Sequence, residues 1–191
     1  MISKKEKELK SLEKEILSCK KCVLYKKRNF PVIGQGSFKA KIMFVGEAPG
    51  AKEDATGIPF CGRSGKFLDE LLKSAGIDRE KVYICNIIKC RPPQNRDPEE
   101  KEIKACSRFI KKQIEILSPK VICPLGRHSM RFIMEMSGFS EDIDVIGKIH
   151  GKVLKGKNTV IPFYHPAVAL YNPNMKKVLK KDFKILKKYV N

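Results

Sequence analysis

The order of apolar and amphipathic segments constrains the fold of this chain more than any other feature of its sequence. Four short apolar runs typical of buried strands begin at Lys41, Val82, Val121 and Thr159. Helical patterns separate them, at residues 64–76, 98–117 and 127–136. Strands that alternate with helices join by right-handed crossovers into a parallel sheet with helices on both faces. The sequence therefore predicts an α/β fold with a central, mainly parallel four-stranded sheet.

Two further helices are predicted at the ends of the chain. Leu9, Leu12 and Ile16 recur at helical spacing within residues 4–18, and a basic helix is predicted over residues 175–190. The segment between residues 137 and 158 is less regular and is expected to contain short strands. With 191 residues and no internal repeat or low-complexity linker, we expect residues 1–191 to form a single domain.

The charge of the chain favours a polyanionic partner. There are 40 Lys and Arg residues against 21 Asp and Glu residues, which gives a formal net charge of +19. Nucleic acid is the leading candidate and an anionic membrane surface the weaker one, whereas a Lys-rich surface typical of heat-adapted proteins would need no partner. The charged N-terminus and the lack of an apolar run of roughly 18 residues predict a soluble, cytoplasmic protein without disulfides.

Residues suited to chemistry follow the predicted strands. Glu47 lies in GEAPG after the first strand, Asn86 at the end of the second, Gly126 after the third, and His165 after the fourth. In open α/β sheets ligands bind at the carboxyl ends of the strands, so these loops should meet in one cleft. Gly and Pro alone are ordinary strand-ending residues, and Gly50 or Pro166 would not by itself indicate a site. The combination of a carboxylate, a carboxamide and an imidazole does indicate one.

His165 is the strongest single candidate for a catalytic side chain. The sequence contains three histidines, and His128 and His150 lie in segments without other catalytic residue types. A lone histidine is often structural. His165 stands at a strand end before a proline, where its imidazole can point into the cleft as a hydrogen-bond donor or an acid/base.

The cysteine pattern predicts a metal site. Cys19 and Cys22 form the pair CKKC, which brings two thiolates within reach of one metal, and Cys90 and Cys106 are the best candidates for the other two ligands. Cys85 and Cys123 lie in apolar strands and are expected in the core, and Cys61 is expected beside the cleft. Spacing alone leaves a four-cysteine zinc site and a 4Fe-4S cluster equally open.

Several motifs together resemble those of the family 4 uracil-DNA glycosylases. The matching segments are GEAPGAKEDATGIPF, NIIKCRPPQNRDP and YHPA, together with the four cysteines. The resemblance runs through nearly the whole chain. It implies a three-layer α/β/α sandwich, a structural 4Fe-4S cluster rather than zinc, and an enzyme that flips uracil out of single- or double-stranded DNA and hydrolyses its N-glycosidic bond, leaving an abasic site.

The resemblance also implies roles for individual residues. Asn86 would read the uracil edge, Phe60 would stack on the flipped base, and Glu53 would lie near C5. His165 would donate to O2 of the departing uracil, and Glu47 is the nearest candidate to orient the water, ahead of Asp54. Gly46 and Ala48 would complete the substrate site. A better-known branch of the superfamily has an aspartate where this chain has Ala48.

DNA contacts are expected from two further regions. Leu170 or Tyr171 would fill the gap left by the flipped base, although the family pattern has Leu at Ala169 and Arg at Tyr171. Basic residues around the cysteines would contact phosphates: Lys20, Lys21, Lys26, Lys27, Arg28, Arg91 and Arg96. We expect a monomer, and the sequence does not reveal whether a sliding clamp binds it. The alternatives are a glycosylase for another deaminated base and a non-catalytic, metal-stabilised nucleic-acid-binding module.

Overall fold

The computed structural model describes residues 3–139 and 145–190. The α-helices are α1 Lys4–Leu17, α2 Ala51–Thr56, α3 Arg63–Ser74, α4 Glu100–Leu117, α5 Arg127–Met136, α6 Ile146–Ile149, α7 Val168–Tyr171 and α8 Met175–Phe183. The strands are β1 Gln35–Gly36, β2 Ile42–Gly46, β3 Tyr83–Asn86, β4 Val121–Pro124, β5 Leu154–Lys155 and β6 Thr159–Val160. Short 3-10 turns occupy Val23–Lys26, Arg79–Lys81, Pro93–Asn95 and Lys184–Tyr189. Residues 140–144, within the segment predicted to be irregular, lie outside the described residues.

The strands form one six-stranded sheet in the order β1-β3-β2-β4-β6-β5. The four predicted strands are its parallel centre, and two short antiparallel strands, β1 and β5, are added at the edges. Every residue of β2, β3 and β4 is buried, as expected for parallel strands covered on both faces. The predicted α/β class is confirmed, and the four-stranded sheet is corrected to six strands.

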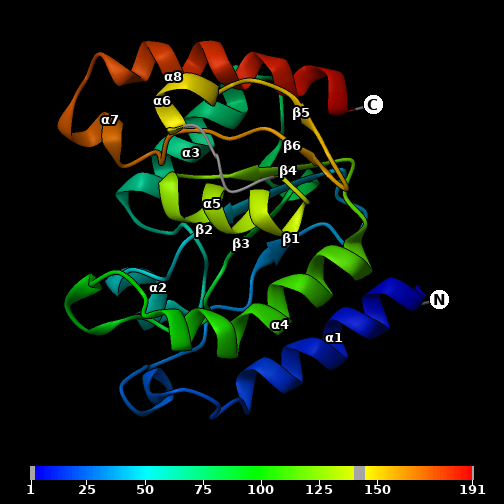
Figure 1. The fold of residues 1–191 in the computed structure, drawn as a ribbon, viewed down its shortest axis with the longest axis vertical. Helices are drawn as coiled ribbons and strands as arrows, with labels where there is room; N and C mark the ends of the chain where they lie inside the picture. The colour runs from blue at the N-terminus through cyan, green and yellow to red at the C-terminus, as the bar shows by residue number, and fades with distance from the viewer. Residues whose placement is uncertain (1–2, 140–144, 191) are drawn as a thin grey trace.

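Helices cover both faces of the sheet. One core cluster joins α1, α4 and α5 to the sheet through residues such as Ile16, Ile110 and Ile133. The other joins α3 and α8 to the opposite face through residues such as Leu71 and Phe183. Figure 1 shows α8 on one side of the strands and the pair α1 and α4 on the other. The resulting architecture is a three-layer α/β/α sandwich.

Local signals explain where the helices begin. The hydroxyl of Ser3 accepts a hydrogen bond from the backbone N–H of Glu6 at 3.3 Å and caps α1. Glu99 and Glu102 form a capping box at the start of α4. The helix predicted over residues 64–76 is α3, whose N-cap is Gly62, and Ser64 lies in its first turn.

Within the part of the chain that the structure describes, no helix combines the length and the apolar character needed to cross a membrane.

Candidate active site

The loops after β2, β3 and β6 enclose a pocket of about 150 Å³ at the carboxyl edge of the sheet. The pocket is lined by Ala48, Gly50, Glu53, Phe60, Ser64, Asn86 and His165. Figure 1 shows α2 and α7, which follow two of these strands, on the same side of the molecule. The convergence of strand-end loops predicted from the sequence is therefore present, and five of the predicted site residues line the pocket.

Gly46 allows two of the lining residues to meet. Gly46 is paired with Asn86 in the β2–β3 ladder, and the side chain of Asn86 is only 2% exposed. A Cβ atom on Gly46 would collide with Oδ1 of Asn86 and would lie 2.9 Å from the ring of Phe60. The missing side chain at Gly46 thus brings a carboxamide and an aromatic ring together in one pocket.

The backbone of Phe60 has an unusual conformation. Its φ is 51°, in the left-handed region that non-glycine residues rarely occupy, and its ring is 5% exposed. Gly65, in the first turn of α3, lies so close that a Cβ atom there would collide with the Phe60 carbonyl. Such strain persists only where the surrounding structure imposes it, and it is common at functional sites. Here it aims the Phe60 ring towards His165, with the ring centroids 5.6 Å apart.

His165 is held as a neutral hydrogen-bond donor. The backbone N–H of Ala167 donates to Nδ1 of His165 at 3.1 Å, so Nδ1 acts as the acceptor and the ring proton sits on Nε2. Burial lowers the pKa of His165 to about 4, which keeps the ring uncharged at neutral pH. An uncharged N–H in a pocket can stabilise negative charge that develops on a bound molecule.

Glu53 and Ser64 occupy another wall of the pocket. Glu53 is 9% exposed, and its Oε2 would lie 2.7 Å from a Cβ atom on Gly50 and its Oε1 3.5 Å from one on Gly62. The two glycines therefore make room for the carboxylate. Ser64 and Gly50 were not predicted as site residues. The signal that could have found Ser64 is its place in the first turn of a helix that begins at the same edge of the sheet as Asn86.

Glu47 lies beside the pocket rather than in its lining. Its half-buried carboxylate belongs to a cluster with Asp97 and His128 in which the oxygen and nitrogen atoms lie within 4.8 Å of one another. Burial and the nearby charge of Asp97 raise the pKa of Glu47, while His128 and Arg127 act in the opposite direction. Its backbone carbonyl accepts a hydrogen bond from Ile88 at 3.1 Å, which extends the link between the loops after β2 and β3.

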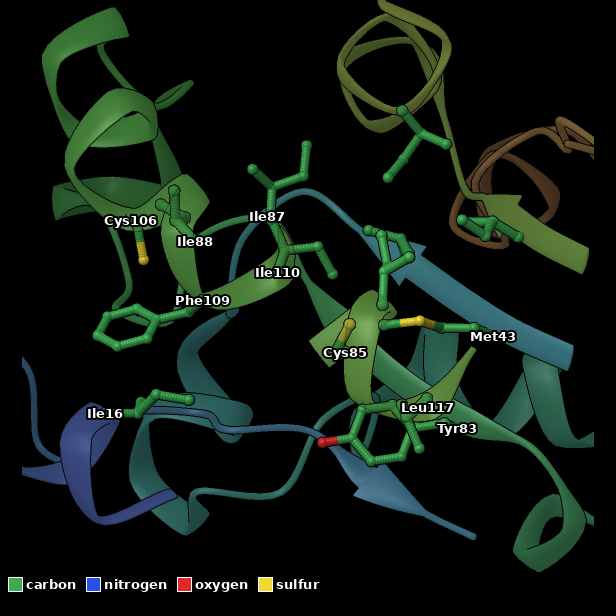
Figure 2. Close-up of a cluster of buried hydrophobic side chains, with 14 of the residues drawn as sticks. Ile16, Met43, Tyr83, Cys85, Ile87, Ile88, Cys106, Phe109, Ile110 and Leu117 are labelled. Atoms are coloured by element: carbon green, nitrogen blue, oxygen red, sulfur yellow. The ribbon is translucent and has the colours of Figure 1, made fainter. Parts of the chain in front are cut away.

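The four predicted metal ligands line a second, smaller cavity. Cys19 and Cys22 follow α1, Cys90 follows β3, and Cys106 lies on α4, yet all four border the same space. Cys85 and Cys123 are completely buried in the sheet, as predicted for core residues. Figure 2 shows this difference: Cys85 lies among apolar side chains of the sheet, whereas Cys106 lies beside Phe109 at one end of the cluster. Cys61 contacts Thr56 at 3.3 Å and does not line the pocket.

Two N–H groups point at the sulfur atoms of this cavity. The guanidinium of Arg28 donates to Sγ of Cys90 at 3.1 Å, and the backbone N–H of Lys89 donates to Sγ of Cys106 at 3.3 Å. Burial raises the pKa of the Cys106 thiol to about 11 and also raises that of Cys90, which Arg28 partly offsets. Four thiols that meet in one cavity, with donors aimed at their sulfurs, fit a cation or cluster that would displace the thiol protons.

Comparisons of the whole sequence with known proteins all point to the same family. The family described as the uracil DNA glycosylase superfamily matches residues 33–188. The chain is 50% identical over 182 residues to a type-4 uracil-DNA glycosylase of Sulfurisphaera tokodaii, covering 92% of this chain and 82% of that protein. It is 45% identical to one of Archaeoglobus fulgidus, covering 92% and 90%, and 38% identical to one of Thermotoga maritima, covering 97% and 96%.

Proposed function

The chain belongs to the uracil DNA glycosylase superfamily and, within it, to the type-4 enzymes that excise uracil from DNA, and from that premise we propose how its pocket performs the excision. Asn86 reads the flipped base, His165 stabilises the base as it leaves, and Phe60 and Glu53 shape the pocket around the ring. The observation that carries this assignment is the meeting of these four side chains in one pocket at the carboxyl edge of the sheet.

Asn86 supplies base recognition. Its carboxamide can donate to O4 of uracil and accept from N3–H, whereas cytosine presents the opposite pattern of donor and acceptor at these positions. The contact between Gly46 and the Asn86 side chain leaves little freedom for the carboxamide to move. Phe60 offers a face for the extruded base, and stacking of this kind contributes roughly 1–3 kcal/mol per base. Glu53, which lines the same pocket, would exclude the methyl group of thymine.

His165 supplies most of the stabilisation of the leaving group. Cleavage of the N-glycosidic bond leaves negative charge on the uracil ring and positive character on the sugar. The Nε2–H of neutral His165 donates to O2 of the departing ring, and removing such a preorganised donor typically costs about 100- to 1,000-fold in rate. Water then adds to the sugar carbon, with Glu47 as the residue that orients it. The raised pKa of Glu47 suits a carboxylate that accepts a proton from this water.

The four-cysteine cavity is the proposed site of a structural 4Fe-4S cluster. Cys19, Cys22, Cys90 and Cys106 supply the four thiolates that such a cluster takes, and the type-4 names of the relatives favour iron-sulfur over zinc. When bound, the cluster would tie the chain after α1 to the loop after β3 and to α4. It would take no part in the excision.

A strand-cleavage assay tests the proposed roles. The purified protein is incubated with labelled oligonucleotides that contain one uracil, hypoxanthine or thymine, and alkali then cleaves at any abasic site. We expect cleavage at uracil alone, abolished in Asn86→Ala and reduced about 100- to 1,000-fold in His165→Ala.

The matched control is His150→Ala, because His150 pairs with Asp182 at 2.7 Å and does not line the pocket. This variant should cleave like the unmodified enzyme. Release of another base in preference to uracil would contradict the assignment of Asn86, and full activity in His165→Ala would contradict that of His165.

A further inference from the structure

Lys89 is a buried cation that the proposed reaction does not use. Its side chain is 1% exposed, and Nζ donates to the backbone carbonyl of Asn86 at 2.7 Å and to Oε1 of Gln113 at 2.7 Å. Both acceptors are uncharged. Because an ammonium in the protein interior is costly unless it is paired or fully hydrogen-bonded, a lysine at this position needs a physical reason.

The first contact fixes the end of β3. Asn86 is the last residue of the strand, and its carbonyl is held by the side chain three residues later along the chain. The neighbouring N–H groups of Ile87 and Ile88 donate to the carbonyls of Gly46 and Glu47. The segment that carries Asn86 is therefore held by β2 and also by Lys89, so the lysine helps to fix the backbone from which the carboxamide extends.

The same residue belongs to the cysteine cavity. Its backbone N–H donates to Sγ of Cys106 at 3.3 Å, it precedes Cys90, and it lines the cavity that the four cysteines border. Four thiolates around a cluster would give this region excess negative charge, and the Lys89 ammonium is a buried positive charge placed to balance it.

Gln113 links this lysine to the rest of the fold. Gln113 is completely buried on α4, and its amide Nε2 donates to the carbonyl of Ile33 at 2.8 Å and to the hydroxyl of Tyr83 at 3.1 Å. Its oxygen accepts from the Lys89 ammonium. The network thus joins α4, β3 and the loop before β1 around one ammonium group.

We propose that Lys89 is a positioning residue that connects the cysteine cavity to the base pocket by holding the Asn86 backbone while its charge balances the bound cluster. This inference rests on the proposed roles of Asn86 and of the four cysteines. Through this link the cysteine site also serves base recognition, because the residue whose backbone N–H contacts Sγ of Cys106 also holds the carbonyl of Asn86 with its side chain.

The test compares Lys89→Met, which keeps the length of the side chain but removes its charge and donors, with the control Lys73→Met. Lys73 is an exposed residue in the last turn of α3, outside the pocket and the cysteine cavity. For Lys89→Met we expect an excision rate lower by roughly 10- to 100-fold under single-turnover conditions and faster loss of iron to a chelator. Lys73→Met should match the unmodified enzyme in both.

Equilibrium binding of an uncleavable oligonucleotide distinguishes a positioning role of Lys89 from general damage to the fold. The probe is an oligonucleotide with one 2′-fluoro-2′-deoxyuridine, whose glycosidic bond resists cleavage, and the reference is the same strand with cytidine. Lys89→Met should lose most of the preference for the uracil strand and keep the affinity for the reference strand. In an Asn86→Ala background the same substitution should change the preference no further, because the lysine acts through Asn86.

If Lys89→Met does not retain its cluster, a second variant, Gln113→Met, tests the same link. Gln113→Met keeps the lysine but removes its side-chain acceptor on α4, and it should lower both the excision rate and the uracil preference by less than Lys89→Met. Unchanged preference in both variants would overturn the inference. If the unmodified enzyme itself neither excises uracil nor prefers the uracil strand, it is the assignment of the base pocket that fails.

Discussion

At Gly46, strand β2 passes close to Asn86 and Phe60, two residues of the pocket proposed to bind the base. A methyl group there would collide with the Asn86 carboxamide and approach the Phe60 ring to 2.9 Å. We predict that Gly46→Ala lowers the excision rate by about 100-fold, because a displacement of about 1 Å at a reacting centre has effects of this size. Single-turnover excision of uracil measures the effect.

The control for this substitution is Gly147→Ala. Gly147 lies in α6, and the contact that a Cβ atom there would make with the described residues is with the hydroxyl of Tyr164, at 3.3 Å. This variant should excise uracil at the normal rate. A Gly46→Ala enzyme with normal excision would show that the carboxamide can move aside without loss, and the role of close packing at Asn86 would be wrong.

His165 should make the stability of the fold depend on pH. Its pKa is about 4 in the folded chain and about 6.5 when unfolded, so the unfolded state binds the extra proton between these values. The stabilisation from the neutral ring is complete above pH 6.5 and is lost as the pH falls towards 4. Between pH 7.5 and 5 we predict a loss of about 2 kcal/mol in the free energy of unfolding from this residue.

Denaturant unfolding of His165→Gln at the two pH values measures this contribution. The variant should lose about 2 kcal/mol less than the unmodified chain between pH 7.5 and 5, because Gln carries no titrating group. His150→Gln leaves the contribution of His165 in place and serves as the reference. Equal losses in His165→Gln and the unmodified chain would mean that the imidazole is not held neutral by the fold.

At the scale of elements, Arg28 connects α1 to the loop after β3. Its guanidinium donates to Sγ of Cys90 at 3.1 Å and to the carbonyl of Leu17, the last residue of α1, at 2.9 Å. We predict that the proposed cluster of Arg28→Met loses its iron to a chelator roughly 10- to 100-fold faster, since outer hydrogen bonds contribute this much to metal retention. Bleaching of the visible absorption of the cluster gives the rate.

Lys27→Met is the matched control, because Lys27 is the exposed neighbour of Arg28. It changes the same charge without touching a cysteine, so the bleaching rate should not change. If both variants bleach alike, the effect is one of overall charge and the hydrogen bond to Cys90 contributes nothing measurable.

The long elements and the two-residue strand β6, which lies in a longer apolar run, could be predicted from the sequence, whereas other short elements could not be placed. The apolar runs that became β2, β3 and β4 and the helical pattern of residues 127–136 were long enough to show their periodicity. The edge strands β1 and β5 have two residues each and carry no such pattern, although short strands were expected within residues 137–158, where β5 lies. Helix α2 follows the Pro-Gly pair of GEAPGA, which indicated a loop, and this six-residue helix is tied to the preceding chain by hydrogen bonds from Asn29 and Phe30 to Asp54.

The site, like the fold, could be predicted from the sequence only in part. The sequence placed Asn86 and His165 at strand ends, and the parallel order of the strands then brought them together. It could not show that Glu47 turns towards Asp97 and His128 while its neighbour Ala48 lines the pocket. Nor could it show Lys89 as a buried link, because lysine is almost always an exposed residue and its two partners lie on different elements.

For the whole molecule, the net charge of +19 predicts salt-dependent binding of DNA. Each phosphate that the protein neutralises releases counterions, and the slope of log affinity against log salt is about −0.9 per phosphate on duplex DNA. If about five phosphates are neutralised, the slope is about −4.5. The excision rate at saturating DNA should change little, because the reaction takes place in a partly closed pocket.

The position of the charge decides which lysines set this slope. Figure 1 shows the loop after α1 on the same side of the molecule as α2 and α7, whereas the last 3-10 turn, Lys184–Tyr189, follows α8 on the other side. We predict that Lys20→Gln combined with Lys21→Gln makes the slope shallower by about 1.8. Lys187→Gln combined with Lys188→Gln removes the same charge from the exposed surface of the last 3-10 turn and should leave the slope unchanged. Equal effects of the two pairs would mean that DNA affinity depends on the total charge. The loop between Cys19 and Cys22 would then make no phosphate contacts of its own.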